Sequence, residues 1–377
     1  MRFKSAFTVG KLLGIPINIH VTFLLIIPVF VWVFAVSEST FFWFKLGFGS
    51  LSSIALRIIF AFLATGILFF CVLLHELGHS YIALKYGTKI RAITLFIFGG
   101  IASIEKIPRA PEKECGIAIA GPLTSLAIGA CFSAAFLAVS ILPYNSILSY
   151  FAILFSVLGF YNIFLACFNL LPAFPMDGGR LLRAWLATKM SYLDATSKAV
   201  VMGKICALLM GLFGLGLNPW LAFSPMLVVI AFIIYIAAGE EERMTTVTIT
   251  LENVKVRDIM SADVTKVSPN LTVEKLVELM LKTKYIGFPV IEEAMQKLEG
   301  IVTLTDVRKI PVEQRCAVLV KDIMTKNIIH ITPEEGAVEA LKVMAKHNIG
   351  RLLVLENGKI VGIVSRTDLM RAIQILR

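Results

Sequence analysis

The chain has 377 residues, of which 57% are apolar, with a mean hydropathy of +0.82 and a formal net charge of +10. This composition excludes an ordinary soluble protein of the same length. The first 239 residues hold seven acidic residues against 16 Lys and Arg, whereas residues 240–377 hold 19 against 20. The sequence therefore predicts a basic membrane part, residues 1–239, followed by a charge-balanced soluble part.

Six apolar stretches are long enough to cross a bilayer as helices, which takes about 20 residues. They are residues 19–36, 54–83, 116–142, 147–171, 197–216 and 221–238. With the N-terminus in the cytoplasm, the cytoplasmic segments carry 14 Lys and Arg, and the external loops carry only Lys45. This asymmetry predicts a multi-pass protein of the cell membrane with both termini cytoplasmic. Anionic lipid of the bilayer accounts for the basic excess, so no nucleic-acid partner is expected.

The second stretch ends in the segment CVLLHELGHSYIALKY, residues 71–86. On a helix, His75 and His79 lie one turn apart on one face, so both imidazoles can reach one zinc ion. Glu76, beside them, can take a proton from the attacking water. A catalytic zinc normally has a third protein ligand and one position open to water. His20 is expected to be an interfacial residue, because a fourth protein ligand would close that position.

The loop after this helix, Lys89–Ile107, is rich in residues that favour strands. Gly99 and Gly100 lie near its centre and favour a tight turn. We therefore predict a small β-hairpin at the cytoplasmic face of the membrane. An irregular re-entrant loop is the alternative for the same residues.

Only one acidic residue of the membrane part, Asp177, directly follows an apolar stretch. It lies in NLLPAFPMDGGR, residues 169–180, where two prolines end the helix and two glycines allow close backbone approach. A carboxylate in such a place is costly unless it is paired or binds a metal. Asp177 is thus either the third zinc ligand or the partner of Arg180, and the nearby HELGH motif favours the ligand.

Together, HELGH and the later pattern N-x-x-P-x-x-P-x-D-G-G resemble the site-2 protease family of intramembrane zinc metalloproteases, over about residues 1–238. The resemblance implies that His75, His79 and Asp177 bind zinc and that Glu76 is the general base. The segment AGPLTS, residues 120–125, is similar to a further motif of the family, which often has Asn where this chain has Ser125.

The same resemblance assigns residues to the substrate. Asn169 matches a residue that steadies the substrate backbone. The extended segment of Phe98, Gly99, Gly100 and Ile101 resembles the strand that pairs with an unwound substrate. An edge strand can hold a peptide in this way through main-chain hydrogen bonds.

The soluble part contains an internal repeat. VKVRDIMSADVTKVSP (254–269) matches VLVKDIMTKNIIHITP (318–333), and GIVTLTDV (300–307) matches GIVSRTDL (362–369). Each copy alternates short strands with an amphipathic helix, Thr272–Thr283 or Glu335–His347. Because one copy alone would bury little apolar surface, we expect an α/β fold in which the two copies pack as a pair.

This repeat resembles tandem cystathionine-β-synthase (CBS) domains, here residues 254–316 and 317–377 after a linker at 240–253. The resemblance implies that an adenosine nucleotide such as ATP or AMP binds at the repeated Gly-h-h-Ser/Thr-x-x-Asp motif, where h is apolar. The residues concerned are Thr303, Asp306, Ser365 and Asp368. The alternative is that each Asp caps the following helix and the pair only forms a homodimer.

The sequence as a whole therefore predicts a membrane α-helical protein with an α/β CBS pair. Its expected activity is that of an intramembrane zinc endopeptidase with one zinc ion per chain. The expected substrate is a transmembrane polypeptide, and nucleotide binding to the CBS pair is expected to modulate its cleavage. The alternative is a CBS-regulated transporter or channel for metal ions, which would not need Glu76.

Overall fold

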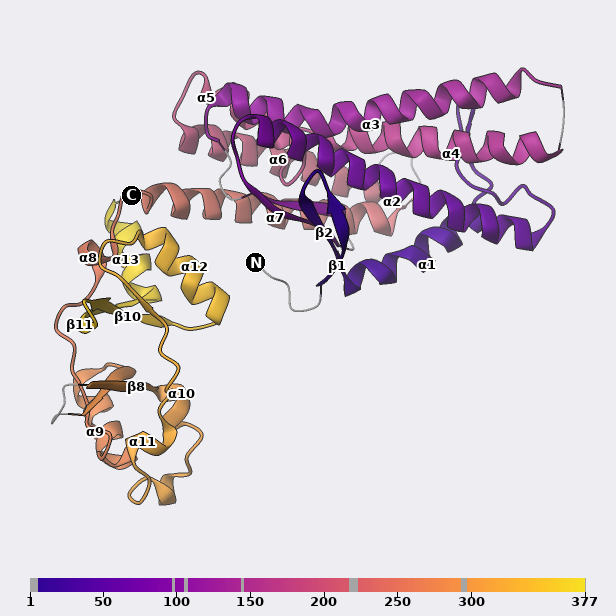
Figure 1. The fold of residues 1–377 in the computed structure, drawn as a ribbon. Helices are drawn as coiled ribbons and strands as arrows, with labels where there is room; N and C mark the ends of the chain where they lie inside the picture. The colour runs from indigo at the N-terminus through magenta and orange to yellow at the C-terminus, as the bar shows by residue number, and fades with distance from the viewer. Residues whose placement is uncertain are drawn as a thin grey trace. The chain divides into compact units, whose positions relative to one another are not determined.

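The computed structural model describes residues 6–96, 99–104, 108–143, 146–216, 223–292 and 297–376. The chain divides into two compact units, Met1–Thr245 and Thr246–Arg377 (Figure 1). The boundary falls within a helix, so a single continuous element belongs to both units.

Helices make up most of the first unit. They are α1 (Val21–Val36), α2 (Ile54–Lys85), α3 (Pro111–Ser140), α4 (Ser146–Asn169), α5 (Asp177–Ala187), α6 (Tyr192–Gly214) and α7 (Pro225–Thr250). Within the described residues, α2, α3, α4 and α6 are long and apolar enough to cross a membrane, whereas α1 is shorter, with 16 residues. In the described residues, each of the six predicted spans overlaps one of these helices, and Figure 1 shows α3 and α4 running side by side.

The N-terminal segment differs from the prediction. Residues 15–20 form strand β2 (Ile15–His20), so the first helix begins at Val21 and not at residue 19. The His20 side chain caps this helix, because its Nδ1 accepts a hydrogen bond from the Thr22 backbone N–H at 3.2 Å. A side-chain acceptor at this position satisfies one of the free N–H groups of the first turn, which sets where the helix starts.

A four-stranded sheet packs against the bundle, with strand order β1-β2-β5-β6. The strands are β1 (Ala6–Leu12), β2, β5 (Ile90–Phe96) and β6 (Gly99–Ile104); a separate short hairpin comprises β3 (Thr40–Phe41) and β4 (Phe44–Lys45). β5 and β6 form the predicted antiparallel hairpin, and β2 joins it by parallel pairing, with Ile17 opposite Ile93. Strand β6 therefore lies at an edge of the sheet.

The glycines of this hairpin do not form the turn that the sequence predicted. Phe96 pairs with Gly99, so Gly99 and Gly100 belong to β6, and the connecting residues 97–98 lie outside the described residues. Gly99 has φ +123°, a conformation that residues with a side chain rarely adopt. Gly100 lies directly against the Glu76 side chain. Glycine is thus required at position 99 by the backbone conformation and at position 100 by the close approach of Glu76, and neither glycine forms the turn.

Apolar contacts fix the sheet on the last turns of α2. Ile15, Ile17 and Ile93 of the sheet are buried together with Leu73 and Leu77 of α2. These two leucines flank His75 in the sequence. The packing therefore holds the histidine-bearing turns of α2 between the sheet and the other helices.

The second unit contains the two predicted copies. Their elements are α8 (Val256–Ile259), α9 (Val273–Thr283), β7 (Gly287–Glu292), β8 (Lys297–Thr303), α10 (Leu304–Val307), the 3-10 helix η1 (Val312–Gln314), α11 (Val320–Ile323), β9 (His330–Ile331), α12 (Ala337–His347), β10 (Arg351–Glu356), β11 (Lys359–Ser365) and α13 (Arg366–Leu376). The sheets are β7-β8 and β11-β10-β9. In each copy an amphipathic helix, α9 or α12, is followed by an antiparallel hairpin.

Each copy completes the core of the other. Val256, at the start of the first copy, is buried with Leu352 of the second. Val320, at the start of the second copy, is buried with Phe288 of the first. The two copies therefore pack as a pair, as predicted. The segment predicted as a linker, residues 240–253, is helical as far as Thr250, and the exact domain limits stay a prediction.

Candidate functional site

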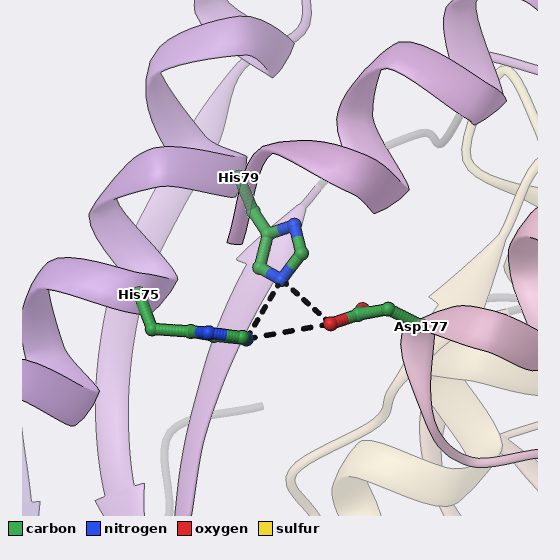
Figure 2. A group of neighbouring side chains, drawn as sticks. All are labelled: His75, His79 and Asp177. Carbon is green, nitrogen blue, oxygen red and sulfur yellow. Dashed lines mark hydrogen bonds and ion pairs between the residues drawn. The ribbon is translucent and has the colours of Figure 1, made fainter. Parts of the chain in front are cut away.

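Three side chains that are far apart in the sequence meet at one point in the first unit. His75 and His79 come from α2, and Asp177 is the first residue of α5 (Figure 2). His75 Nε2 and His79 Nε2 are 3.2 Å apart, and Asp177 Oδ2 lies 3.3 Å from the former and 3.1 Å from the latter. In the described part of the chain, this is the one group of three or more His, Cys, Asp or Glu residues arranged to hold a metal ion.

The spacing of these three atoms fits a zinc ion. In a tetrahedral site with bonds of about 2.0–2.1 Å, ligand atoms lie about 3.3–3.4 Å from one another. The observed separations of 3.1–3.3 Å are close to that edge length. Two imidazoles and one carboxylate leave a fourth corner open, as a hydrolytic zinc site requires.

Helix α3 fixes the orientation of both imidazole rings. His79 Nδ1 lies 2.7 Å from the backbone carbonyl oxygen of Ile117. Since a carbonyl only accepts, Nδ1 carries the proton, which leaves Nε2 as the nitrogen that the neutral ring would offer to a metal ion. His75 Nδ1 lies 2.9 Å from the hydroxyl of Ser125, which is fully buried. Such partners behind ligating histidines orient the rings toward the metal.

Gly121 lets α3 approach the rings this closely. A Cβ atom at this position would collide with the His79 ring and would stand 2.7 Å from His75 Nε2. The helix backbone therefore forms one wall of the candidate metal site. No sequence pattern assigned a role to Gly121 or to the Ile117 carbonyl, because these contacts join residues more than 30 positions apart.

Asp177 is positioned by an ion pair elsewhere on its helix. Arg183 of α5 is buried, and its Nη2 lies 2.7 Å from the Glu114 carboxylate of α3. A second carboxylate, that of Glu241 on α7, lies 2.9 Å from Nη1. Asp177 itself makes no ion pair with Arg180 among the described residues, so the structure does not support that alternative.

Glu76 follows His75 on α2, and its side chain is half-buried. It lies against Gly100 of the edge strand β6: a Cβ atom there would stand 3.1 Å from Glu76 Cδ and 3.3 Å from Oε1. The proposed base and the proposed substrate-binding strand are therefore neighbours. Gly99 and Ile101 belong to the same strand, whereas Phe98 lies outside the described residues.

In the described part of the chain, Asn169 makes no hydrogen bond with the three metal-site residues. It is the last residue of α4, and its Nδ2 donates to the Leu165 carbonyl of the same helix at 3.0 Å. The described structure thus leaves its predicted contact with substrate as a prediction.

The four predicted nucleotide-binding residues form two similar arrangements in the second unit. Asp306 Oδ2 accepts hydrogen bonds from the backbone N–H and the hydroxyl of Thr303, and Asp368 Oδ2 accepts the corresponding bonds from Ser365. Each aspartate therefore caps the helix in whose first turn it lies, as the alternative expected. This capping uses one oxygen of each carboxylate, so the predicted nucleotide binding is not excluded.

Comparison with known families assigns both parts of the chain. The model of peptidase family M50 matches residues 63–150 and 138–212, and the CBS domain model matches residues 256–313 and 320–375. A zinc metalloprotease of Methanocaldococcus jannaschii, MJ0392, is 37% identical over 97% of this chain and 95% of its own length. This chain belongs to peptidase family M50. The predictions of a zinc metallopeptidase and of a CBS pair are thereby confirmed.

Two further proteins are similar to this chain. Rip3 of Mycobacterium tuberculosis is 30% identical over 99% of this chain and 94% of its own length. The solved structure of a site-2 protease from M. jannaschii is 38% identical, covers 63% of this chain and 95% of its own, and has a TM-score of 0.42. The matched families give the transporter alternative no support.

Proposed function

We propose that this M50 peptidase is an intramembrane zinc endopeptidase that cleaves peptide bonds in or near transmembrane segments of other membrane proteins. One observation carries the proposal. The triangle of His75 Nε2, His79 Nε2 and Asp177 Oδ2 lies at the end of the long apolar helix α2. Hydrolytic chemistry at this place acts on a chain that is itself in the membrane.

In this proposal, His75, His79 and Asp177 hold one zinc ion per chain. When bound, the ion supplies Lewis acidity, which polarises the scissile carbonyl and makes water a better nucleophile. Glu76 takes a proton from the attacking water and delivers it to the leaving amine. Ser125 and the Ile117 carbonyl keep the two imidazole rings in place during these steps.

The substrate is a transmembrane polypeptide that must unwind before it is cut. We propose that its extended backbone pairs with β6, an edge strand that offers unpaired main-chain groups. Gly99, Gly100 and Ile101 belong to this strand, and Phe98 precedes it in the proposed substrate-binding segment. Because Gly100 lies against Glu76, a chain paired there passes next to the base. Asn169 is proposed to steady the same backbone.

The four long apolar helices support a position in the bilayer. The excess of Lys and Arg in alternate loops supports a multi-pass arrangement in the cell membrane with both termini in the cytoplasm. Water then reaches the metal site from the cytoplasmic side. This arrangement explains why a water-using motif can end a membrane helix.

We also propose that an adenosine nucleotide, ATP or AMP, binds the CBS pair through Thr303, Asp306, Ser365 and Asp368 and modulates cleavage. Helix α7 supports this coupling. It carries Glu241, which binds Arg183 of α5, and it continues without a break to Thr250, next to the buried Leu251 of the CBS core. A homodimer formed through the CBS pair is a further part of the proposal.

The exchange Glu76→Gln tests the peptidase mechanism. It removes the base but none of the three ligands, so we expect unchanged zinc content and a loss of cleavage of about 10²–10⁴-fold. Purified protein should be assayed with a single-span membrane substrate, and zinc measured by elemental analysis. Glu112→Gln, at an exposed acid of α3, is the matched control and should cleave normally. Unchanged cleavage by Glu76→Gln would contradict the mechanism.

A further inference from the structure

The two CBS copies differ at one pair of equivalent positions. In the first copy, Gly287 of β7 pairs with Thr303 of β8. In the second copy, Arg351 of β10 pairs with Ser365 of β11. Paired residues of an antiparallel hairpin direct their side chains to the same face. The second copy therefore places a guanidinium beside its Ser-Asp motif, whereas the first copy has no side chain at that position.

The two motif aspartates also differ in what they still offer a ligand. Asp306 is buried, and both of its oxygens are engaged: Oδ2 with Thr303 and Oδ1 with Lys309 Nζ at 3.2 Å. Asp368 is half-buried, and Oδ2 binds Ser365. No hydrogen bond from any described residue reaches its Oδ1. Only the second copy thus keeps a free carboxylate oxygen that can accept from a ribose hydroxyl.

Arg351 is a half-buried cation of strand β10. Among the described residues, its guanidinium makes no hydrogen bond and no ion pair within 4.0 Å. It lies against the first copy, with Cζ 2.9 Å from the place where a Cβ on Gly287 would stand. Burial lowers the pKa of Arg351 and the charge of Asp368 opposes this, so the guanidinium is partly desolvated and near that carboxylate. A phosphate would satisfy it, because the planar fork of Arg binds phosphate oxygens in pairs.

We propose that the chain has one nucleotide site, formed by Arg351, Ser365 and Asp368, and that this site recognises a 5′-phosphorylated adenosine through its phosphate. Asp368 Oδ1 accepts from the ribose, and Arg351 binds the phosphate. The motif of the first copy, in which Lys309 already engages Asp306, takes no nucleotide. This inference rests on the proposed nucleotide binding and narrows it to one copy and one charged ligand class.

Calorimetric titration of the full-length protein in detergent tests the proposal, with AMP and adenosine as probes that differ only in the phosphate. We expect one AMP per chain. Arg351→Met should weaken AMP binding about 10- to 100-fold, the usual effect of losing hydrogen bonds to a charged group. It should leave adenosine binding unchanged, which also shows that the variant is folded. Arg351→Lys should recover part of the AMP affinity.

Lys309→Met is the control, since it removes the cation that pairs with Asp306 of the first copy and leaves Arg351 and Asp368 unchanged. It should bind AMP at the second copy with the affinity of the unaltered protein. Two AMP molecules of equal affinity per chain would overturn the proposal, as would unchanged AMP binding by Arg351→Met. In both cases nucleotide binding itself would stand. If the unaltered protein binds neither AMP nor adenosine, the nucleotide part of the proposed function fails and this inference fails with it.

Discussion

The contact between Gly121 and the metal-site histidines allows a sharp test of the site. A Cβ atom added at Gly121 would overlap the His79 ring and stand 2.7 Å from His75 Nε2, well inside an ordinary van der Waals distance of 3.4 Å or more. Both rings sit on a rigid helix, and their Nδ1 atoms are held by Ile117 and Ser125. In Gly121→Ala the rings must therefore move by about 1 Å or lose those partners.

The expected cost follows from this displacement. Moving catalytic groups by about 1 Å typically costs about 10²-fold in rate. That factor corresponds to about 2.7 kcal/mol of transition-state stabilisation. The backbone effect has the opposite sign, because Ala in a helix interior is favoured over Gly by about 0.5–1 kcal/mol. We thus expect Gly121→Ala to stay folded, to hold less zinc and to cleave at least about 100-fold more slowly.

Gly66→Ala is the matched control for this experiment. Gly66 lies in the interior of α2, and a Cβ there meets nothing within 4 Å, so the same change should leave activity intact. Zinc content, unfolding temperature and cleavage of a single-span substrate should be measured for both variants. If Gly121→Ala retained full zinc and full cleavage, α3 would not form the wall of the active site and the proposed geometry would be wrong.

Further predictions concern residues that hold the proposed zinc ligands, or the helices that carry them, in place. Ser125→Ala removes the partner of His75 Nδ1 and should weaken zinc binding about 10- to 100-fold, measured by competition with a chelator. Ser133→Ala is the control, because it removes only a hydrogen bond from the Ser133 hydroxyl to a carbonyl of its own helix. Equal zinc affinities of the Ser125→Ala and Ser133→Ala variants would exclude a role of Ser125 in holding the His75 ring. Arg183→Met leaves the buried Glu114 carboxylate without its ion-pair partner and should destabilise the fold by about 3–5 kcal/mol. Glu241→Gln should cost about 1 kcal/mol or less, because its carboxylate is one-third exposed. Thermal unfolding in detergent compares the stability of Arg183→Met and Glu241→Gln. Equal losses of stability would contradict the conclusion that the Glu114 carboxylate is buried and the Glu241 carboxylate is partly exposed.

Local sequence patterns predicted the parts of the structure that depend on near neighbours. The i, i+4 spacing of His75 and His79 needs only a helix to bring both rings together, and α2 is that helix. The prolines before Asp177 ended α4 as expected, and α5 begins at the acid itself. The repeat of the soluble part likewise predicted a pair, because two copies with the same apolar pattern can bury each other's surface.

Contacts between distant residues could not be predicted in this way. The N-terminal residues were expected only to form a cytoplasmic segment, yet β2 pairs in parallel with β5, and nothing local specifies a partner 76 positions away, as Ile17 and Ile93 are. The alternation of apolar residues in IPINIH was the available signal for a strand. Glu114 and Arg183 were counted only as charges. Their pairing depends on how α3 and α5 pack, which no short pattern encodes.

The pairing of Glu114 with Arg183 bears directly on the chemistry. Helix α2 brings the two histidines together by spacing alone, but Asp177 arrives on a separate, short helix that begins at that residue. Its distance from the imidazole rings therefore depends on how α5 packs against α3, the helix that also orients both rings. Arg183 of α5 holds the two helices together through its ion pair with Glu114 of α3, which is buried and therefore poorly screened by water. The metal site is thus completed by an ion pair outside both zinc motifs, and the carboxylate ligand is the part of the site most sensitive to movements of α5.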